Sequence, residues 1–520
     1  MSWEPEVTEI KRRKKAALAM GGEKNVKRQH DAGRLTIRER VDRLLDKDTF
    51  HEVGGLAGSA TYNPDGSTAS FAATNVIYGR GKIDGRPVVL AGDDFTMRGG
   101  SAEAGNIDKL RHTEMFAKEY RLPLIRVVEG SGGGGSVRTF EEIGRTYMPG
   151  GNQSGSYSYL MADAMATVPV VALGLGPIAG LGAARMVASH YSVMVRDQSS
   201  MFIAGPPLVA RAGGGKLTKE ELGGAKIHVN AGAIDDAVDT EDEAFERARR
   251  FLSYLPSSVY DLPTRIAPAD DTERRDESLL SIVPRERRKV YAMRKIIESV
   301  VDKGSFFEMG KQFGRSIITG FARVDGWPVA LMAGDPMHYG GSWTAAAAQK
   351  IIRFVDLAGT FHLPMVNLYD CPGFKIGLDA EMAGTVRHAT RAVFAICQYQ
   401  GPWCSVIIRN CFGLAGGAHQ PQGRLNFRYA WPSARWGSLP LEGGVEAAYK
   451  SEIEAAADPK AKLVEIEARL EALQSPLRTA ETYDVEDIID PRDTRPLLAE
   501  FVNLTAPLRP VGPASWGLRP

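Results

Sequence analysis

The chain has 520 residues, which is too long for one ordinary core and predicts two or three domains. Its 64 Lys and Arg against 63 Asp and Glu leave a formal charge of +1, so no long-range field favours nucleic acid or a membrane surface. The four cysteines form no C-x-x-C pair, and the sequence has neither an apolar leader nor a run of eighteen apolar residues. We therefore expect a cytoplasmic or organelle-matrix protein that holds no metal and acts on a small molecule or a protein partner.

A first glycine cluster follows an expected strand. Residues Leu124–Val128 are mostly apolar, as in a buried strand, and one residue later the chain continues Gly130-Ser131-Gly132-Gly133-Gly134-Gly135. Many glycine clusters are flexible surface turns. At a strand end, however, glycines let backbone N–H groups approach a ligand closely, and paired N–H donors stabilise a developing oxyanion. The placement of this cluster favours an oxyanion site.

A second glycine cluster, Gly174–Gly182, follows the apolar run Val168–Leu173. A dinucleotide fold is an alternative here, because Asp197 comes about twenty residues later. The glycines do not follow G-x-G-x-x-G, however, and Pro177 lies within the turn. A P-loop is excluded, since the Gly-Lys pair at 215–216 is followed by Leu217 instead of Ser or Thr. Neither G-x-S-x-G nor H-E-x-x-H occurs in the sequence.

Three histidines are candidates for a site. His388 lies in an expected helix near Arg387 and Arg391, and we expect it on the surface or in packing rather than as a base. His338 and His419 lie beside glycine-rich loops and can line a site.

An internal repeat organises the chain. Lys82–Leu90 recurs as Arg323–Leu331, with Gly85 and Gly326 at a sequence offset of 326 − 85 = 241. Farther along, Gly180 and Gly413 have an offset of 413 − 180 = 233, which places a short indel between the two pairs. The sequence therefore predicts two homologous α/β domains.

We expect these domains at 1–260 and 286–505, joined by a charged, Pro-rich linker at 261–285 and followed by a loose tail at 506–520. Further strands are expected at Val193–Val195 and Ser405–Ile408, and helices at Glu446–Leu473. One more helix is predicted by the apolar positions Ala348, Ile351, Ile352, Val355 and Ala358, with Lys350, Arg353 and Asp356 on the other side.

Several motifs occur in a fixed order along both halves. They are Gly33–Arg40, Asp94–Ser101, Ser131–Gly133, Gly176–Gly180 and Glu220–Ala225 in the first half, and Pro336-Met337, Pro372–Phe374, Arg387-His388 and Ile489–Arg495 in the second. In this order the motifs resemble those of the carboxyltransferase (β) subunits of biotin-dependent acyl-CoA carboxylases, the propionyl-CoA carboxylase group in particular. The resemblance covers roughly Lys11–Leu498.

The resemblance implies two tandem crotonase-like (ClpP/crotonase) domains that carry CO2 from carboxybiotin to the α-carbon of an acyl-CoA. In such enzymes the ureido anion left by CO2 release abstracts the α-proton and the thioester enolate attacks CO2, so each half supplies one oxyanion hole. By position, the N–H groups of Gly132 and Gly133 serve the enolate, and those of Gly341 and Ser342 serve biotin. The implied acyl-CoA side is Gly180, Gly182, Trp343 and Thr344, and the implied biotin side is Gly373, Phe374 and Gly413.

Partners follow from the same resemblance. No Ala/Val-Met-Lys-Met biotinylation sequence occurs, so biotin is expected on a separate biotin carboxylase/biotin carboxyl carrier (α) subunit. The resemblance also implies a homo-oligomer, a hexamer built as a trimer of dimers, in which the site forms between the first half of one copy and the second half of another.

Departures from the family pattern concern the acyl group. Gly134-Gly135 stands where the family usually has Ala-Arg, and Leu181 replaces a glycine. Thr344, preceded by Trp343, stands at the position where an Asp is often found, and Phe412–Ala418 replaces Tyr-Gly-Gly-Ala-Tyr. Loss of a carboxylate and gain of an indole predict a pocket for a bulkier acyl group, or for one that carries a ring or polar group.

Three alternatives remain at this point. The same fold serves biotin-dependent decarboxylases, which run the transfer in reverse. A cofactor-free crotonase-type hydratase or isomerase needs a placed acid or base, and none stands out in the sequence. A non-catalytic scaffold derived from this fold would oligomerise without binding CoA.

Overall fold

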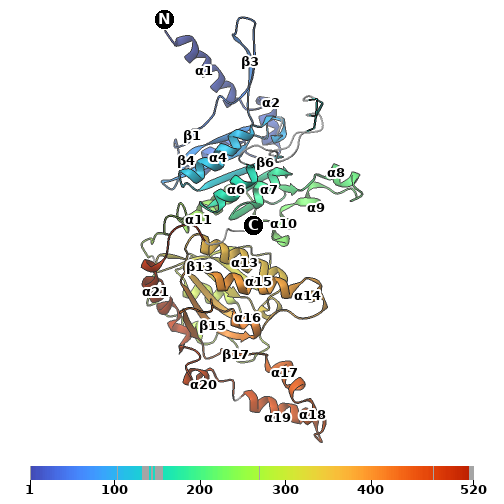
Figure 1. The fold of residues 1–520 in the computed structure, drawn as a ribbon, viewed down its shortest axis with the longest axis vertical. Coiled ribbons are helices and arrows are strands. Elements are labelled where there is room, and N and C mark those ends of the chain that lie inside the picture. The colour runs from blue at the N-terminus through green and yellow to red at the C-terminus, as the bar shows by residue number, and fades with distance from the viewer. Residues whose placement is uncertain are drawn as a thin grey trace. The chain divides into compact units, whose positions relative to one another are not determined.

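The computed structural model describes residues 2–101, 104–131, 140–141, 144–146, 156–268, 270–471 and 473–514. Internal contacts divide the chain into two compact units, Met1–Asp261 and Leu262–Arg519 (Figure 1). Residues 262–285 belong to the second unit, where Arg274 donates to the carbonyl oxygen of Ser299 at 2.9 Å. Each unit is an α/β domain built on its own eight-stranded sheet.

The sheet of the first unit has the strand order β1-β4-β5-β6-β7-β8-β10, and β9 pairs with the end of β7. Strand β4 is antiparallel to both of its neighbours, β1 and β5, and β5, β6, β7, β8 and β10 run parallel. The elements are α1 (Glu4–Leu18), α2 (Glu23–Asp31), α3 (Ile37–Leu44), β1 (His51–Glu52), β2 (Gly58–Tyr62), β3 (Thr68–Ala73), β4 (Val76–Ile83), β5 (Arg86–Asp93), η1 (Arg98–Gly100), α4 (Ile107–Glu119), β6 (Leu124–Gly130), α6 (Tyr157–Met165), β7 (Val170–Ala179), α7 (Leu181–Val187), β8 (Tyr191–Val195), β9 (Ser200–Phe202), α8 (Pro206–Arg211), α9 (Lys219–Gly223), α10 (Ala225–Ala231), β10 (Asp236–Val238) and α11 (Glu241–Ser253).

The sheet of the second unit has the order β11-β12-β13-β14-β15-β16-β18, and β17 pairs with the end of β15. The elements are η3 (Glu277–Leu280), α12 (Met293–Val300), β11 (Phe307–Met309), β12 (Ile317–Val324), β13 (Trp327–Gly334), η4 (Tyr339–Gly341), α13 (Ala345–Thr360), β14 (Met365–Cys371), α14 (Leu378–Met382), α15 (Thr385–Gln398), β15 (Trp403–Phe412), α16 (Gly413–Gly417), β16 (Phe427–Ala430), β17 (Arg435–Gly437), α17 (Leu441–Ala448), α18 (Lys450–Glu454), α19 (Pro459–Glu471), α20 (Pro476–Glu481), β18 (Asp487–Ile488), η5 (Pro491–Asp493), α21 (Thr494–Thr505) and η6 (Ala506–Leu508).

The matching strand orders confirm the predicted repeat. The first residues of β4 and β12 have an offset of 317 − 76 = 241, and those of β7 and β15 have an offset of 403 − 170 = 233, which are the two offsets seen in the sequence. Turn conformations repeat as well, since Gly85 and Gly326 have φ angles of 78° and 75°, and Gly180 and Gly413 have 57° and 63°. Residues with a Cβ rarely adopt such angles, which explains glycine at the equivalent turns.

The central strands form because they are buried along their whole length. All seven residues of β6 and all ten of β15 are buried, as in a parallel sheet that is covered on both faces. The strands expected at Leu124–Val128, Val168–Leu173, Val193–Val195 and Ser405–Ile408 correspond to β6, β7, β8 and β15.

The helix predicted around Ala348–Ala358 is α13. The amphipathic pattern predicts that its polar side is exposed to solvent, but Lys350 and Asp356 on that side are buried. Lys350 and Asp356 are only 7% and 2% exposed, because α13 also packs against α15 and β12. The Lys350 ammonium donates to the carbonyl oxygens of Phe313 at 3.1 Å and Ile317 at 2.8 Å, and these hydrogen bonds offset part of the cost of its burial.

The helical region expected at Glu446–Leu473 corresponds to the end of α17 together with α18 and α19. Among the helices that the structure describes, none is both long and apolar enough to cross a membrane.

We expect Leu331→Ala to lower the free energy of unfolding of the second unit by about 2–5 kcal/mol, because Leu331 is fully buried in its core and truncation leaves a cavity. Val464→Ala on α19 is the matched control, since Val464 is 63% exposed, and should change stability by at most about 0.5 kcal/mol. Urea unfolding, monitored through hydrogen exchange in peptides of the second unit, measures both changes in the free energy of unfolding. Equal effects of the two changes would contradict the assigned core.

Candidate active site at the carboxyl edges of the two sheets

Two loops of the second unit meet beyond the carboxyl end of β14. The Trp343 N–H donates to the Gly373 carbonyl oxygen at 3.1 Å, and the Lys375 N–H donates to the Trp343 carbonyl oxygen at 2.9 Å. The Trp343 indole is fully buried and stacks on Phe374, with ring centroids 6.0 Å apart. Trp343, predicted on the acyl-CoA side, and Gly373 and Phe374, predicted on the biotin side, therefore form one packed structure.

The N–H groups of Gly341 and Ser342, predicted as oxyanion donors, have partners within a local turn. They donate to the carbonyl oxygens of His338 and Tyr339, both at 3.0 Å. Gly341 has a φ of 84°, and a Cβ on it would lie 2.4 Å from the carbonyl oxygen of Asp370. Glycine is thus required here for the close packing of two backbone segments.

Thr344 begins α13. Its Oγ1 accepts the N–H of Ala347 at 3.0 Å, which makes Thr344 the N-cap of this helix. An N-cap contributes about 1 kcal/mol, so Thr344 has a structural role in addition to the predicted role in acyl selection.

Gly413 follows β15, the strand next to β14. Cys371 on β14 pairs with Cys411 on β15, so Gly373 and Gly413 each lie two residues beyond paired positions at one sheet edge. Gly413 turns the chain into α16, whose first N–H groups have no acceptor within the helix. These groups belong to residues 413–415, of which only Gly413 was predicted from the sequence. The signal for the others was the equivalence of Gly413 with Gly180.

The first unit repeats this arrangement. Gly180 turns the chain from β7 into α7, and the N–H of Gly182 donates to the carbonyl oxygen of Ser131 at 3.0 Å. Gly182 also lies against the end of β6, since a Cβ on it would be 2.7 Å from the carbonyl oxygen of Gly130. The predicted donors Gly132 and Gly133 lie outside the described residues. The chain enters that segment at Ser131, in contact with the turn at Gly180–Gly182.

A cavity of about 440 Å³ lies beside α16 in the second unit. Its polar and aromatic lining includes Cys411, His419, Arg428, Trp436, Thr479 and Asp484. In the first unit, the positions equivalent to Cys411 and His419 by the offset of β7 and β15 are Ile178 and Met186, which belong to a buried apolar cluster. The second unit therefore has a polar cavity where the first unit has a hydrophobic core.

His419 is held firmly at this cavity. Its carbonyl oxygen accepts hydrogen bonds from Asn367 Nδ2 at 2.8 Å, Trp403 Nε1 at 3.0 Å and Ser405 Oγ at 2.7 Å. Its Nδ1 lies 2.7 Å from the carbonyl oxygen of Gly416, which requires the proton on Nδ1. Burial lowers the pKa of the imidazole to about 4, so His419 is neutral at pH 7.

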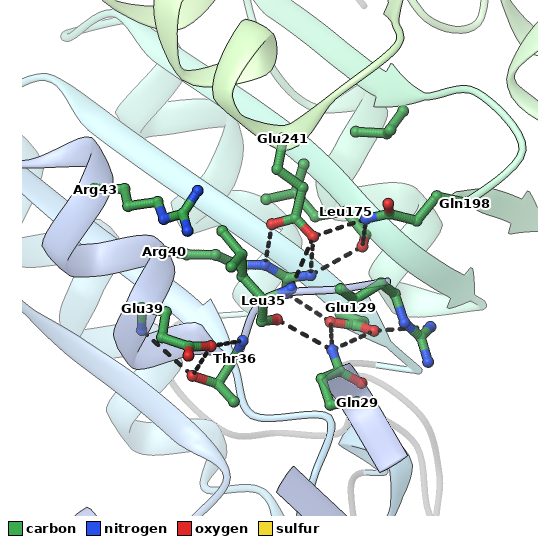
Figure 2. A network of polar contacts seen from close by, with 12 residues as sticks. Gln29, Leu35, Thr36, Glu39, Arg40, Arg43, Glu129, Leu175, Gln198 and Glu241 are labelled. Carbon is green, nitrogen blue, oxygen red and sulfur yellow. Dashed lines mark hydrogen bonds and ion pairs between the residues drawn. The ribbon is translucent and has the colours of Figure 1, made fainter. Parts of the chain in front are cut away.

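A buried charged network fixes the end of β6 (Figure 2). The side chains of Arg40 and Glu129 are both fully buried, and Arg40 Nη1 lies 2.6 Å from Glu129 Oε2. Arg40 also donates to both carboxylate oxygens of Glu241 and to the carbonyl oxygen of Leu175. Burial opposes the charge of Arg40, but the two carboxylates outweigh it and raise the pKa of the guanidinium. The Gly33–Arg40 motif thus places the Arg40 guanidinium at the end of β6, directly before the first glycine cluster.

Comparison with known proteins assigns the family, because residues 28–507 match the model of the carboxyl transferase domain. The chain belongs to the carboxyl transferase family. In the described part of the chain, no group of three or more His, Cys, Asp or Glu side chains is placed to hold a metal ion.

Relatives within the family match over nearly the whole chain. The propionyl-CoA carboxylase carboxyltransferase subunit of Haloferax mediterranei is 33% identical over 506 residues, covering 95% of each chain. The methylmalonyl-CoA carboxyltransferase 12S subunit of Propionibacterium freudenreichii subsp. shermanii is 32% identical, covering 98% of this chain and 96% of its own. A crystal structure of transcarboxylase 12S, described as a hexamer assembly with methylmalonyl-coenzyme A bound, aligns with a TM-score of 0.86 at 30% identity, over 99% and 98% of the two chains. The resemblance seen in the sequence and the tandem crotonase-like fold are confirmed.

We predict that His419 remains neutral down to about pH 5, because its pKa is lowered to about 4 from an ordinary value near 6.5. The unfolded chain takes up this proton near pH 6.5 and the folded chain only near pH 4, so acidification through this window removes stability. The imidazole resonances of His419, assigned by comparison with His419→Gln, report the titration in NMR spectra. A midpoint near pH 6.5 would contradict the burial.

Proposed function

We propose that this carboxyltransferase subunit moves a carboxyl group from biotin, held on a separate carrier, to the α-carbon of an acyl-CoA. The observation that carries the proposal is a duplicated turn. Gly180 and Gly413 occupy equivalent places at the carboxyl edges of the two sheets and share a left-handed conformation. The reaction develops negative charge on two oxygen atoms, one in the thioester and one in the ureido ring, and therefore needs two sets of N–H donors. One set in each half meets this need.

In the first half, the proposed donors to the enolate oxygen are the N–H groups of Gly132 and Gly133. The contact between Gly182 and Ser131 supports this assignment, because it joins the glycine cluster to the turn at Gly180. A single donor of this kind lowers the barrier by roughly 3–4 kcal/mol. Gly180 and Gly182 then border the acyl-CoA.

In the second half, Gly373, Phe374 and Gly413 border the proposed biotin side. The N–H groups of Gly341 and Ser342 donate to local carbonyl oxygens, so we assign the donors to the biotin oxygen to the first N–H groups of α16. The role left for Gly341 is to let η4 pack closely on β14. The side chain of Leu414, 57% exposed beside this turn, offers apolar surface that fits a fused ring. Biotin, when bound, supplies the carboxyl group.

The carrier is proposed to be a biotin carboxylase/biotin carboxyl carrier (α) subunit, since this chain lacks a biotinylation sequence. The hexamer described for transcarboxylase 12S supports a hexamer here, with each site shared between the first half of one copy and the second half of another. A cytoplasmic location is part of the same proposal.

The purified chain should carboxylate no acyl-CoA alone, but should do so with a biotinylated partner, ATP and bicarbonate. Incorporation of labelled bicarbonate into acid-stable product measures the reaction. The matched control is the same partner with its biotinylated lysine replaced by arginine, which should give no product. Equal incorporation with and without biotin would refute the proposal.

The acyl group should be bulkier than propionyl, or should carry a ring or polar group, because Thr344, preceded by Trp343, stands where the family often has an Asp. We expect propionyl-CoA to lie at least about tenfold below the best thioester in kcat/KM, and Thr344→Asp to narrow the gap. Asp also caps helices, so this change preserves the start of α13. Thr344→Ser, which keeps both cap and hydroxyl, is the control. Highest kcat/KM for propionyl- or acetyl-CoA in a panel of thioesters would show that these residues do not set the substrate.

A further inference from the structure

Both halves bury a carboxylate at the same place in the fold. Glu129 on β6 and Asp370 on β14 have the repeat offset, 370 − 129 = 241, and both are 0% exposed. In the sequence, Glu129 directly precedes Gly130 and the first glycine cluster, and Asp370 directly precedes the segment Cys371–Phe374.

The backbone of each carboxylate residue also packs against a second glycine loop. A Cβ on Gly100 would lie 2.6 Å from the carbonyl oxygen of Glu129, and one on Gly341 would lie 2.4 Å from that of Asp370. Each of the two residues therefore adjoins two loops, the one that follows it and the one that packs on it.

The partners of the two carboxylates differ. Glu129 pairs with Arg40 at 2.6 Å and accepts from Gln29 Nε2 at 3.0 and 3.1 Å (Figure 2). It also pairs with Arg34 at 3.1 Å. These three residues come from the N-terminal segment of the chain that contains α2 and α3.

Asp370 uses partners from its own unit. It accepts from the Tyr291 hydroxyl at 2.6 Å and from the N–H and Nδ2 of Asn410 at 2.9 and 2.7 Å, and it lies 3.3 Å from Arg409 Nε. The first-half position equivalent to Arg409 is Gly176, at 409 − 233 = 176. A Cβ on Gly176 would lie 2.2 Å from Glu129 Oε1, so glycine there makes room for the longer acid.

The fold itself does not require the ion pair of the first half. An equivalent ion pair relates α3 in the first unit to α12 in the second. Arg38 on α3 pairs with Glu52, and Arg294 on α12 pairs with Glu308, with equal sequence offsets of 294 − 38 = 256 and 308 − 52 = 256. The same offset places Ile296, fully buried in an apolar core, opposite Arg40. The equivalent helix thus packs with an apolar residue at this position. Since buried ion pairs generally add little stability over apolar replacements, stability does not account for Arg40 and Glu129.

We propose that Glu129 and Asp370 are positioning residues for the two oxyanion sites. Glu129, held by Arg40, sets the place of the N–H donors to the acyl-CoA enolate, and Asp370, held by Arg409 and Tyr291, sets those on the biotin side. The inference rests on the proposed function. A misplacement of about 1 Å at a reacting group can cost 10²-fold in rate, so a buried, multiply bonded anchor at the root of each loop has a direct effect on turnover.

The test uses a CoA analogue in which a nitronate anion replaces the thioester enolate, together with an uncharged CoA thioether of the same length. Calorimetry on the full chain measures the affinity for both. We expect Glu129→Gln to weaken nitronate binding by at least about tenfold while thioether binding changes less than about twofold, because only the nitronate requires the aligned donors. Gln29→Met, which removes a neutral partner of Glu129 and leaves no unpaired charge, should produce a smaller loss in the same direction.

Asp370→Asn should leave the nitronate affinity unchanged and lower kcat for transfer, because it acts on the other half. Asp242→Asn, next to Glu241 but 61% exposed and paired with exposed Arg43, is the matched control and should alter neither quantity. If wild type binds the nitronate no more tightly than the thioether, the proposed function fails. If the wild-type chain binds the nitronate more tightly than the thioether, and both Glu129→Gln and Gln29→Met keep the same ratio of the two affinities, the positioning role is overturned.

Discussion

Close packing of glycine backbone against the end of a buried strand is the constraint on which both halves depend. At Glu129 and Asp370, a carbonyl oxygen comes so near a neighbouring glycine that no Cβ fits between them. Each of these strand ends carries a buried carboxylate with several donors, which we propose holds the strand end in place. The loops that carry the proposed chemistry start from these two points.

Duplication then allowed the halves to diverge without loss of architecture. The first half fills the space beside α7 with Met186 and its apolar neighbours, whereas the second half has a polar cavity at His419. The charge partner of the buried acid also differs, since it is Arg40 near the N-terminus in the first half and Arg409 on a central strand in the second. Under the proposed function, one framework presents similar backbone donors to two different molecules, an acyl-CoA and a biotin ring.

The fold was largely predictable from the sequence, because glycine at left-handed turns and uninterrupted apolar runs leave clear local patterns. The repeat offsets located equivalent strands before any contact was known. Long-range contacts were not predictable: Arg40 and Glu129 are 89 residues apart, and nothing local marks them as a pair. Tertiary packing, which the sequence pattern does not encode, also determines two further features. The N–H groups of Gly341 and Ser342 donate within a turn, and Lys350 is buried.

Single-turnover transfer tests the central claim most directly. A carrier bearing a ¹⁴C-labelled carboxyl group on its biotin is mixed with the full chain and the preferred acyl-CoA, in the absence of ATP and bicarbonate. The account predicts that the label leaves the carrier and appears in the carboxylate attached to the α-carbon of the acyl-CoA. Release of the label as CO2 at the same rate with and without acyl-CoA, and no label in the thioester, would contradict it.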